Sequence, residues 1–160
     1  TMSLSGKISF SGVNFQNWLD RMTGSIAIDG RNVLVQNFNL PAIVRAVDAV
    51  RAVSGLSNSI RLAMDEGSSW VGNINGTVYF TDGNIKTTKV SFRTNESVGE
   101  LEGAINLENW TMDMAVKFGL NSLAQVNYPV FIVNFTGPIN QPEYSLNTKS
   151  VEAYIARKAH

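Results

Sequence analysis

Two residue types that carry much of enzyme chemistry are nearly absent from this chain. Its 160 residues include no cysteine, and its single histidine, His160, is the last residue. Disulfides, thiolate nucleophiles, Ser-His and Cys-His catalytic arrangements and histidine-ligated zinc sites are therefore excluded. The missing cysteine indicates no compartment, because oxidising compartments permit disulfides without requiring them.

Charge is also scarce. Charged residues make up 16% of the chain, against roughly 25% in typical domains, and 13 basic residues balance 13 acidic ones. A net charge of zero gives no general attraction to a phosphate backbone, so we expect no nucleic-acid partner. No stretch approaches the roughly 20 apolar residues that cross a bilayer. The start at Thr1-Met2 indicates a cut inside a longer protein.

Along most of the chain, apolar and polar residues alternate with a period of two, which predicts strands. Between Val98 and Phe118 the apolar residues change parity at Glu108-Asn109, which predicts an antiparallel hairpin turning there. Its apolar pairs would be Leu107 with Trp110, Ile105 with Met112, Gly103 with Met114, and Leu101 with Val116. Its polar pairs would be Asn106 with Thr111, Ala104 with Asp113, and Glu100 with Lys117.

Asp-Gly pairs predict two further hairpins, one between Ile26 and Phe38 near Asp29-Gly30 and one between Ile74 and Phe92 near Asp82-Gly83. A three-residue loop in the second would pair Ile74 with Phe92, Gly76 with Val90 and Val78 with Thr88. Leu4, Ile8 and Phe10 indicate a short first strand. Val130 to Phe135 is apolar on both parities, which predicts a strand covered on both faces. Glycines inside the strands indicate curvature.

Three segments have helical spacing. Pro41 suits a first helical turn, with Ile43, Val47 and Val50 on one side and a stop at Gly55. A second helix would follow on Leu56, Ile60 and Met64, and a third would run to Ala159 with Val151, Tyr154 and Ile155 as its apolar stripe. The predicted class is α+β, mainly β: a curved antiparallel sheet, an open barrel or groove, with one or two short helices inserted as a lid and a C-terminal helix. Residues 1–145 would form one groove-like domain with a helical insertion at about 41–66, followed by the C-terminal helix over 146–160.

The remaining candidates for catalysis are carboxylates. Glu100 and Glu102 would lie on one strand face about 7 Å apart, a separation that glycosidase pairs use. Their position on the polar face, opposite Lys117 and Ala115, favours a solvated surface instead. Asp65-Glu66 has no partner acid or metal-ligand spacing. We therefore expect a protein that is not an enzyme and that needs neither a cofactor nor a metal.

The apolar face of the Val98 to Phe118 hairpin is the candidate functional site. An ordinary core is the usual role of such a face. On a curved sheet that its short helices leave partly accessible, the same side chains would line a trough suited to an acyl chain. The lipid-groove candidates are Leu101, Ile105, Leu107, Trp110, Met112, Met114, Val116 and Phe118.

The order of these pieces resembles the C-terminal region of AsmA-like proteins over roughly residues 22 to 145. The resemblance is carried by glycine-punctuated strands, by an Ile43-Val44 helix entry and by a closing Gly-Pro-Ile-Asn-Gln-Pro element. These segments are Gly24 to Gly30, Val33 to Leu40, Ile74 to Ile85, Gly99 to Leu107 and Phe131 to Pro142.

The resemblance implies the periplasmic part of a Gram-negative inner-membrane-anchored protein, whose anchor would precede this sequence. Its hydrophobic β-sheet groove would serve outer-membrane biogenesis and phospholipid transport between membranes. The partners implied are phospholipid acyl chains, the rest of the same protein and other envelope proteins. Two alternatives stay open. One is a periplasmic protein-interaction or scaffolding domain that assists outer-membrane protein assembly and docks through an edge strand or the C-terminal helix. The other is carbohydrate binding by Trp18, Trp70 or Tyr79.

Overall fold

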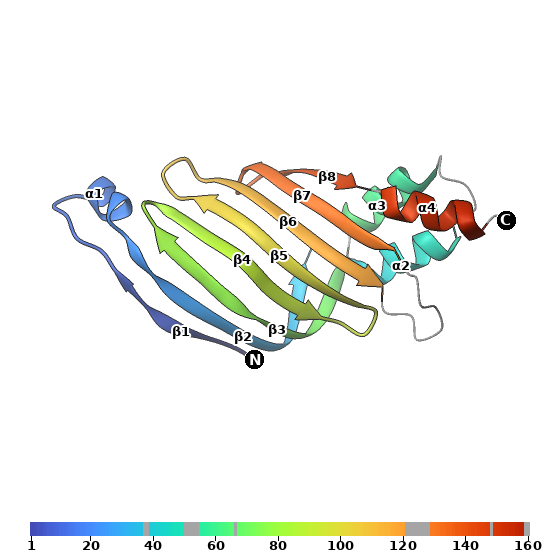
Figure 1. The fold of residues 1–160 in the computed structure, drawn as a ribbon, viewed down its shortest axis with the longest axis horizontal. Helices are drawn as coiled ribbons and strands as arrows, with labels where there is room; N and C mark the ends of the chain where they lie inside the picture. The colour runs from blue at the N-terminus through green and yellow to red at the C-terminus, as the bar shows by residue number, and fades with distance from the viewer. Residues whose placement is uncertain (37–38, 50–54, 66, 121–128, 148, 159–160) are drawn as a thin grey trace.

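The computed structural model describes residues 1–36, 39–49, 55–65, 67–120, 129–147 and 149–158. Figure 1 shows an eight-stranded antiparallel sheet in which the strands follow one another in sequence order. The strands are β1 (Met2–Ser9), β2 (Thr23–Gln36), β3 (Ser68–Thr81), β4 (Asn84–Arg93), β5 (Ser97–Asn106), β6 (Thr111–Leu120), β7 (Val130–Pro138) and β8 (Glu143–Asn147). The helices are α1 (Phe15–Asp20), α2 (Leu40–Ala49), α3 (Leu56–Asp65) and α4 (Lys149–Lys158).

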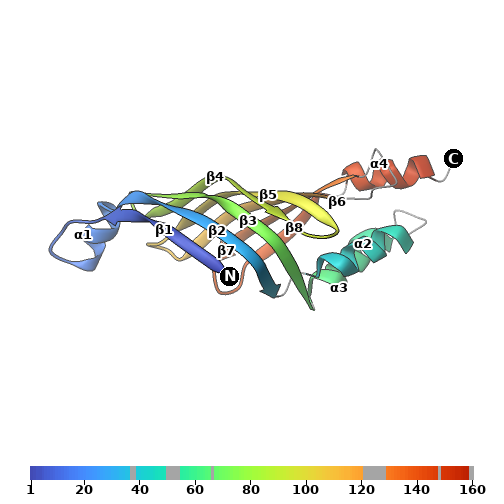
Figure 2. The same cartoon turned by 90° about the horizontal axis from the view of Figure 1, so that it is seen from below.

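The sheet is one open, curved layer, as expected. Strands β1 and β8 form its two edges and do not pair with each other. Helices α2, α3 and α4 gather at one end of the strands, while α1 lies at the other end (Figures 1 and 2). The predicted class is thus confirmed. The helices inserted between β2 and β3 cover one end of the sheet instead of lying over its middle.

The β5–β6 hairpin has the predicted register. Leu101 faces Val116, Gly103 faces Met114 and Ile105 faces Met112. The polar pairs are also as predicted, including Glu100 with Lys117. The strands stop at Asn106 and Thr111, so Leu107 and Trp110 belong to the turn instead of forming a last strand pair. The Asn109 N–H donates to Asn106 Oδ1 at 2.8 Å, which stabilises this turn.

The β3–β4 hairpin turns at Asp82-Gly83, as predicted, with a tighter loop. Both residues have positive φ, 47° and 72°, which fits a two-residue type I′ turn. The pairs Ile74 with Phe92 and Gly76 with Val90 are confirmed.

The predicted three-residue loop and the pairing of Val78 with Thr88 are wrong, because the register shifts between Gly76 and Tyr79. At this irregularity the Thr87 hydroxyl donates to the Thr77 carbonyl oxygen at 2.9 Å and accepts from the Lys89 N–H. These two bonds lie where the regular ladder between β3 and β4 is interrupted.

The hairpin predicted at Asp29-Gly30 is wrong. Strand β2 runs straight through this pair, and Asp29 lies between Ser3 of β1 and Asn75 of β3. Pairing on both sides outweighs the local turn preference of Asp-Gly. Glycine is nevertheless required at position 30, because a Cβ there would lie 2.6 Å from the Ile74 side chain.

The main core lies at the helical end of the sheet. Phe118 and Phe131 stack with ring centroids 5.1 Å apart beneath the helices. The Leu40 N–H at the start of α2 donates to Ser69 Oγ on β3 at 2.8 Å, a buried bond that joins helix and sheet. The buried residues of this cluster are Leu40, Ile43, Leu56, Ile60, Phe118, Phe131, Val133, Val151, Tyr154 and Ile155.

The predicted helices are present, and Leu40, Ile43, Leu56 and Ile60 are buried in this core, whereas Leu62 on α3 is 64% exposed. The C-terminal stripe of Val151, Tyr154 and Ile155 is buried, so α4 packs on the body of the protein. Strand β8 extends to Asn147, past the predicted boundary at residue 145. The prediction that residues 130–135 are covered on both faces is wrong, because Val130 is 48% exposed while Phe131 and Val133 on the other face are buried. Val50 and Glu66 lie outside the described residues, as does the predicted helix end at Ala159.

Candidate functional site

The strand register joins the apolar residues of separate hairpins into one face. A single row crosses all eight strands, and every member is apolar or glycine. This row is Leu4, Ile28, Gly76, Val90, Leu101, Val116, Val133 and Leu146, each facing the next on the neighbouring strand. Since successive side chains alternate between faces, residues two positions away belong to the same face. The exception is the register shift between Thr87 and Val90 on β4, across which Ile85 and Val90 share a face although they are five positions apart.

Parallel rows extend this surface along the strands. Towards the end that carries α1, a row runs through Ile8, Gly24, Phe80, Ile85, Ile105, Met112 and Gly137. Towards the helices, a row runs through Met2, Gly30, Ile74, Phe92, Gly99, Phe118 and Phe131. We call the surface made by these rows the apolar face. Seven spacings of about 4.8 Å make it roughly 34 Å wide across the strands.

The helices bury only one end of the apolar face. Phe118 and Phe131 are 1% and 0% exposed beneath them. Farther from the helices, Leu101, Ile105, Met112 and Met114 remain half-exposed. In the described part of the chain the sheet has no second layer over this region (Figure 2).

The eight candidates from the sequence therefore separate into three groups. Leu101, Ile105, Met112 and Met114 share the open part of the apolar face. Val116 is half-buried against the main core, and Phe118 belongs to that core. Leu107, half-buried, and Trp110, exposed, lie in the β5–β6 turn at the end of the face.

Sequence reasoning missed the contributions of the other strands to the apolar face. Ile26, Phe80 and Ile85 reach it from β2, β3 and β4, and Phe135 and Tyr144 reach it from β7 and β8. Each of these strands alternates on its own. Following the apolar parity of one strand through the hairpin turn into the next strand is the signal that could have assigned these residues to a common face.

Some glycines of the apolar face stand where a larger side chain from the neighbouring strand lies directly over their backbone. A Cβ on Gly99 would lie 2.3 Å from the Phe92 ring, and a Cβ on Gly76 would lie 2.8 Å from a Val90 methyl group. The neighbouring side chains therefore occupy the space above these glycines. This arrangement keeps the face shallow and allows the sheet to bend.

The opposite face of the sheet is polar. A row across it consists of Ser3, Asp29, Asn75, Ser91, Glu100, Lys117, Ile132 and Asn147. Lys117 Nζ lies 2.7 Å from Glu102, and Lys89 Nζ lies 2.8 Å from Glu100. The hydrogen bond to Glu102 and then the charge of that carboxylate raise the pKa of Lys117 above its ordinary value of 10.5. The two glutamates thus take part in ion pairs on an accessible surface.

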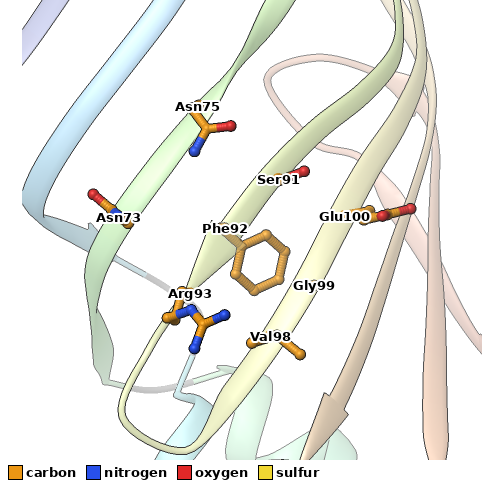
Figure 3. Close-up of a pocket in the computed structure, with 8 residues that line it drawn as sticks. All are labelled: Asn73, Asn75, Ser91, Phe92, Arg93, Val98, Gly99 and Glu100. Carbon is orange, nitrogen blue, oxygen red and sulfur yellow. The ribbon is translucent and has the colours of Figure 1, made fainter.

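A shallow hollow of about 420 Å³ lies over β3, β4 and β5 (Figure 3). Side chains of Asn73, Asn75, Ser91, Arg93 and Glu100 contribute to its lining. The hollow is open and mostly polar, and its charged groups have opposite signs. It lacks the enclosed apolar lining that is typical of small-molecule sites.

Among the residues that the structure describes, neither a metal-binding cluster nor a membrane-spanning helix is present. No group of three or more acidic or histidine side chains in this part of the chain could hold a metal ion. No helix in the same ranges is both long and apolar enough to span a bilayer. Trp18, Trp70 and Tyr79, the residues considered for carbohydrate binding, do not come together. Trp70 and Tyr79 are nine positions apart on β3, which is roughly 30 Å along a strand.

Comparison of the chain with protein-family models, with curated proteins and with solved structures finds no match.

Proposed function

We propose that this protein is a non-catalytic lipid-handling module that holds acyl chains against the apolar face of its sheet. The observation that supports this most is the row from Leu4 to Leu146, which is apolar or glycine on every strand while the opposite row is almost entirely polar. Hydrophobic contact is the interaction that such a surface offers, and it suits a flexible chain without fixed polar groups.

The extent of the apolar face supports a binding role, because it crosses all eight strands and the helices bury only one end of it. Soluble proteins rarely leave contiguous apolar patches of more than a few hundred Å² exposed unless the patch binds something. Each buried CH₂ group of a bound chain contributes about 0.8 kcal/mol. Several CH₂ groups in contact with the half-exposed side chains of β4, β5 and β6 would offset the free-energy cost of ordering the bound acyl chain.

Lipid analysis tests this proposal directly. Native mass spectrometry of the purified protein mixed with phospholipid is expected to show one or more lipid-bound species. Organic extraction of the protein purified from cells is expected to release the bound lipid. A protein that stays lipid-free in both measurements would contradict the proposal.

The AsmA-like resemblance adds a setting to the proposal. In that setting the module is part of an envelope protein, its sheet lies in the periplasm, and the groove takes part in phospholipid transport and outer-membrane biogenesis. Expression of the full-length gene in a Gram-negative host, followed by fractionation, tests the location. Recovery of the protein in the cytosolic fraction would contradict the proposed setting without affecting acyl-chain binding.

Strand addition is the second candidate function, and the open edges of the sheet favour it. Strand β1 pairs only with β2, and Met2 and Leu4 on it are 56% and 60% exposed. An extended segment of another envelope protein would extend the ladder there. The other docking element considered, α4, is less suited because its apolar stripe is buried in the core. Capture of a partner by the protein, lost when Leu4 is replaced by proline, would support strand addition.

A further inference from the structure

The end of the sheet away from α2, α3 and α4 carries an exposed apolar loop. We call residues 10–19, which follow β1 and include most of α1, the tip; Figure 1 places α1 at the far end of the molecule from the three helices. Val13 is 93% exposed, and Phe10, Phe15 and Trp18 are 60%, 61% and 43% exposed. Four large apolar side chains in one short loop exceed the scattered exposure that is normal on a protein surface.

The tip has a defined shape. The Trp18 indole N–H donates to the Gly12 carbonyl oxygen at 2.8 Å, and the Trp18 and Phe10 rings lie 5.8 Å apart. Asn14 caps α1 by accepting from the Asn17 N–H at 2.9 Å. Leu19, at the base, is buried. The exposed side chains are therefore presented by a folded loop.

The tip is also uncharged. Residues 10–19 contain no acidic or basic side chain, and Asp20 and Arg21 follow directly after them. The β5–β6 turn lies at the same end of the strands and adds Trp110, which is 59% exposed. Tryptophan is enriched at the interface between lipid headgroups and acyl chains, and phenylalanine occurs with it on the apolar face of segments that lie in this interface.

We propose that the tip inserts into the surface of a lipid bilayer. The loop projects from the end of the sheet, so a deformable surface accommodates it better than a pocket of fixed shape would. Asp82 and Glu108 in the neighbouring turns give no attraction to anionic headgroups. The contact is therefore apolar, and it should persist on zwitterionic lipid and at high salt.

This proposal uses residues outside the apolar face and can fail independently of acyl-chain binding. Insertion of the tip would bring the open end of the apolar face to the bilayer, where acyl chains are available. Binding of a monomeric fatty acid to the apolar face needs no bilayer. Vesicle binding and fatty-acid binding therefore separate the two proposals.

Flotation with phosphatidylcholine vesicles is the first test. The unmodified protein is expected to float with the vesicles at low and high salt. In the variant Val13→Ser/Phe15→Ser, binding should weaken by about tenfold for each residue replaced. The matched control is Leu62→Ser on α3, which removes a side chain that is 64% exposed at the other end of the molecule and should leave flotation unchanged. Equal flotation of the tip variant and the control, or no flotation of the unmodified protein, would overturn the proposal.

The three tryptophans provide a second test, in which phenylalanine replaces each tryptophan that is removed so that the tip stays apolar. One variant keeps only Trp18 and another keeps only Trp70, which is 64% exposed at the helical end of β3. Lipids brominated on their acyl chains are expected to quench Trp18 and not Trp70. Quenching of Trp70 alone, or of neither, would overturn the proposal. Self-association of the unmodified protein in solution, abolished by the tip substitutions and accompanied by no vesicle binding, would also overturn it and would assign the tip to a contact between copies.

Discussion

Replacing Ile105 and Met112 with serine tests acyl-chain binding at the open part of the apolar face. The two residues face each other across β5 and β6, and both are half-exposed. If together they cover about four CH₂ groups of a bound chain, full burial would contribute roughly 3 kcal/mol. Because the other side of the chain remains open, about half of this is expected. A loss of about 1.5 kcal/mol corresponds to roughly tenfold weaker binding.

Displacement of a fluorescent fatty acid from the purified protein measures this change. The control is Ile132→Ser, because Ile132 is also half-exposed but lies in the polar row, opposite Lys117. Ile105→Ser/Met112→Ser is expected to bind about tenfold more weakly, whereas Ile132→Ser should bind as the unmodified protein does. Circular dichroism checks that both variants are folded. Equal affinities for the two variants would refute the assignment of binding to the apolar face.

Three further predictions concern what holds the sheet and helices together. Phe118→Ala is expected to lower the free energy of unfolding by about 3 to 5 kcal/mol, because Phe118 is 1% exposed and stacks on Phe131; a negligible change in urea unfolding would show that the helical end is not the main core. Ser69→Ala should cost about 1 to 3 kcal/mol, since it removes the acceptor of the buried Leu40 N–H, and an unchanged melting temperature would argue against that bond. The raised pKa of Lys117 stabilises the fold fully below its ordinary value of 10.5, and this contribution is lost as the pH rises through the folded-state pKa. In Glu102→Gln, stability should therefore fall less steeply above pH 10.5 than in the unmodified protein, and identical alkaline profiles would contradict the coupling.

The register of β5 and β6 could be predicted because the two apolar sets of this hairpin leave few choices, although the last predicted pair, Leu107 with Trp110, lies in the turn. Shifting the register by one position would move either Ile105 or Met112 to the polar face, which the alternation forbids. The pair Ile74 with Phe92 follows instead from an assumed three-residue loop, and it holds because the loop is one residue shorter while the register shifts by one between Gly76 and Tyr79. Where both strands of a pair alternate strongly, the pattern alone determines which residues meet.

Other features depend on contacts that lie outside the local pattern. Asp29-Gly30 has the composition of a turn, yet β2 continues because strands on both sides pair with it. The bulge after Gly76 depends on how β3 accommodates β4, and α1 is too short to show helical periodicity. The Asn14 cap was the available signal for α1. The position of α2 and α3 at one end of the sheet, which leaves the apolar face open, results from packing between residues distant in sequence.

Photocrosslinking with a phospholipid that carries a diazirine on its acyl chain tests the central claim most directly. Mass spectrometry would locate the modified residues on the purified protein. The expected sites are Ile105, Met112, Met114 and their neighbours in the apolar rows, with few modifications in the row that contains Glu100 and Lys117. Modification of the polar face alone, or no modification of the folded protein at all, would contradict the claim that the open side of this sheet holds acyl chains.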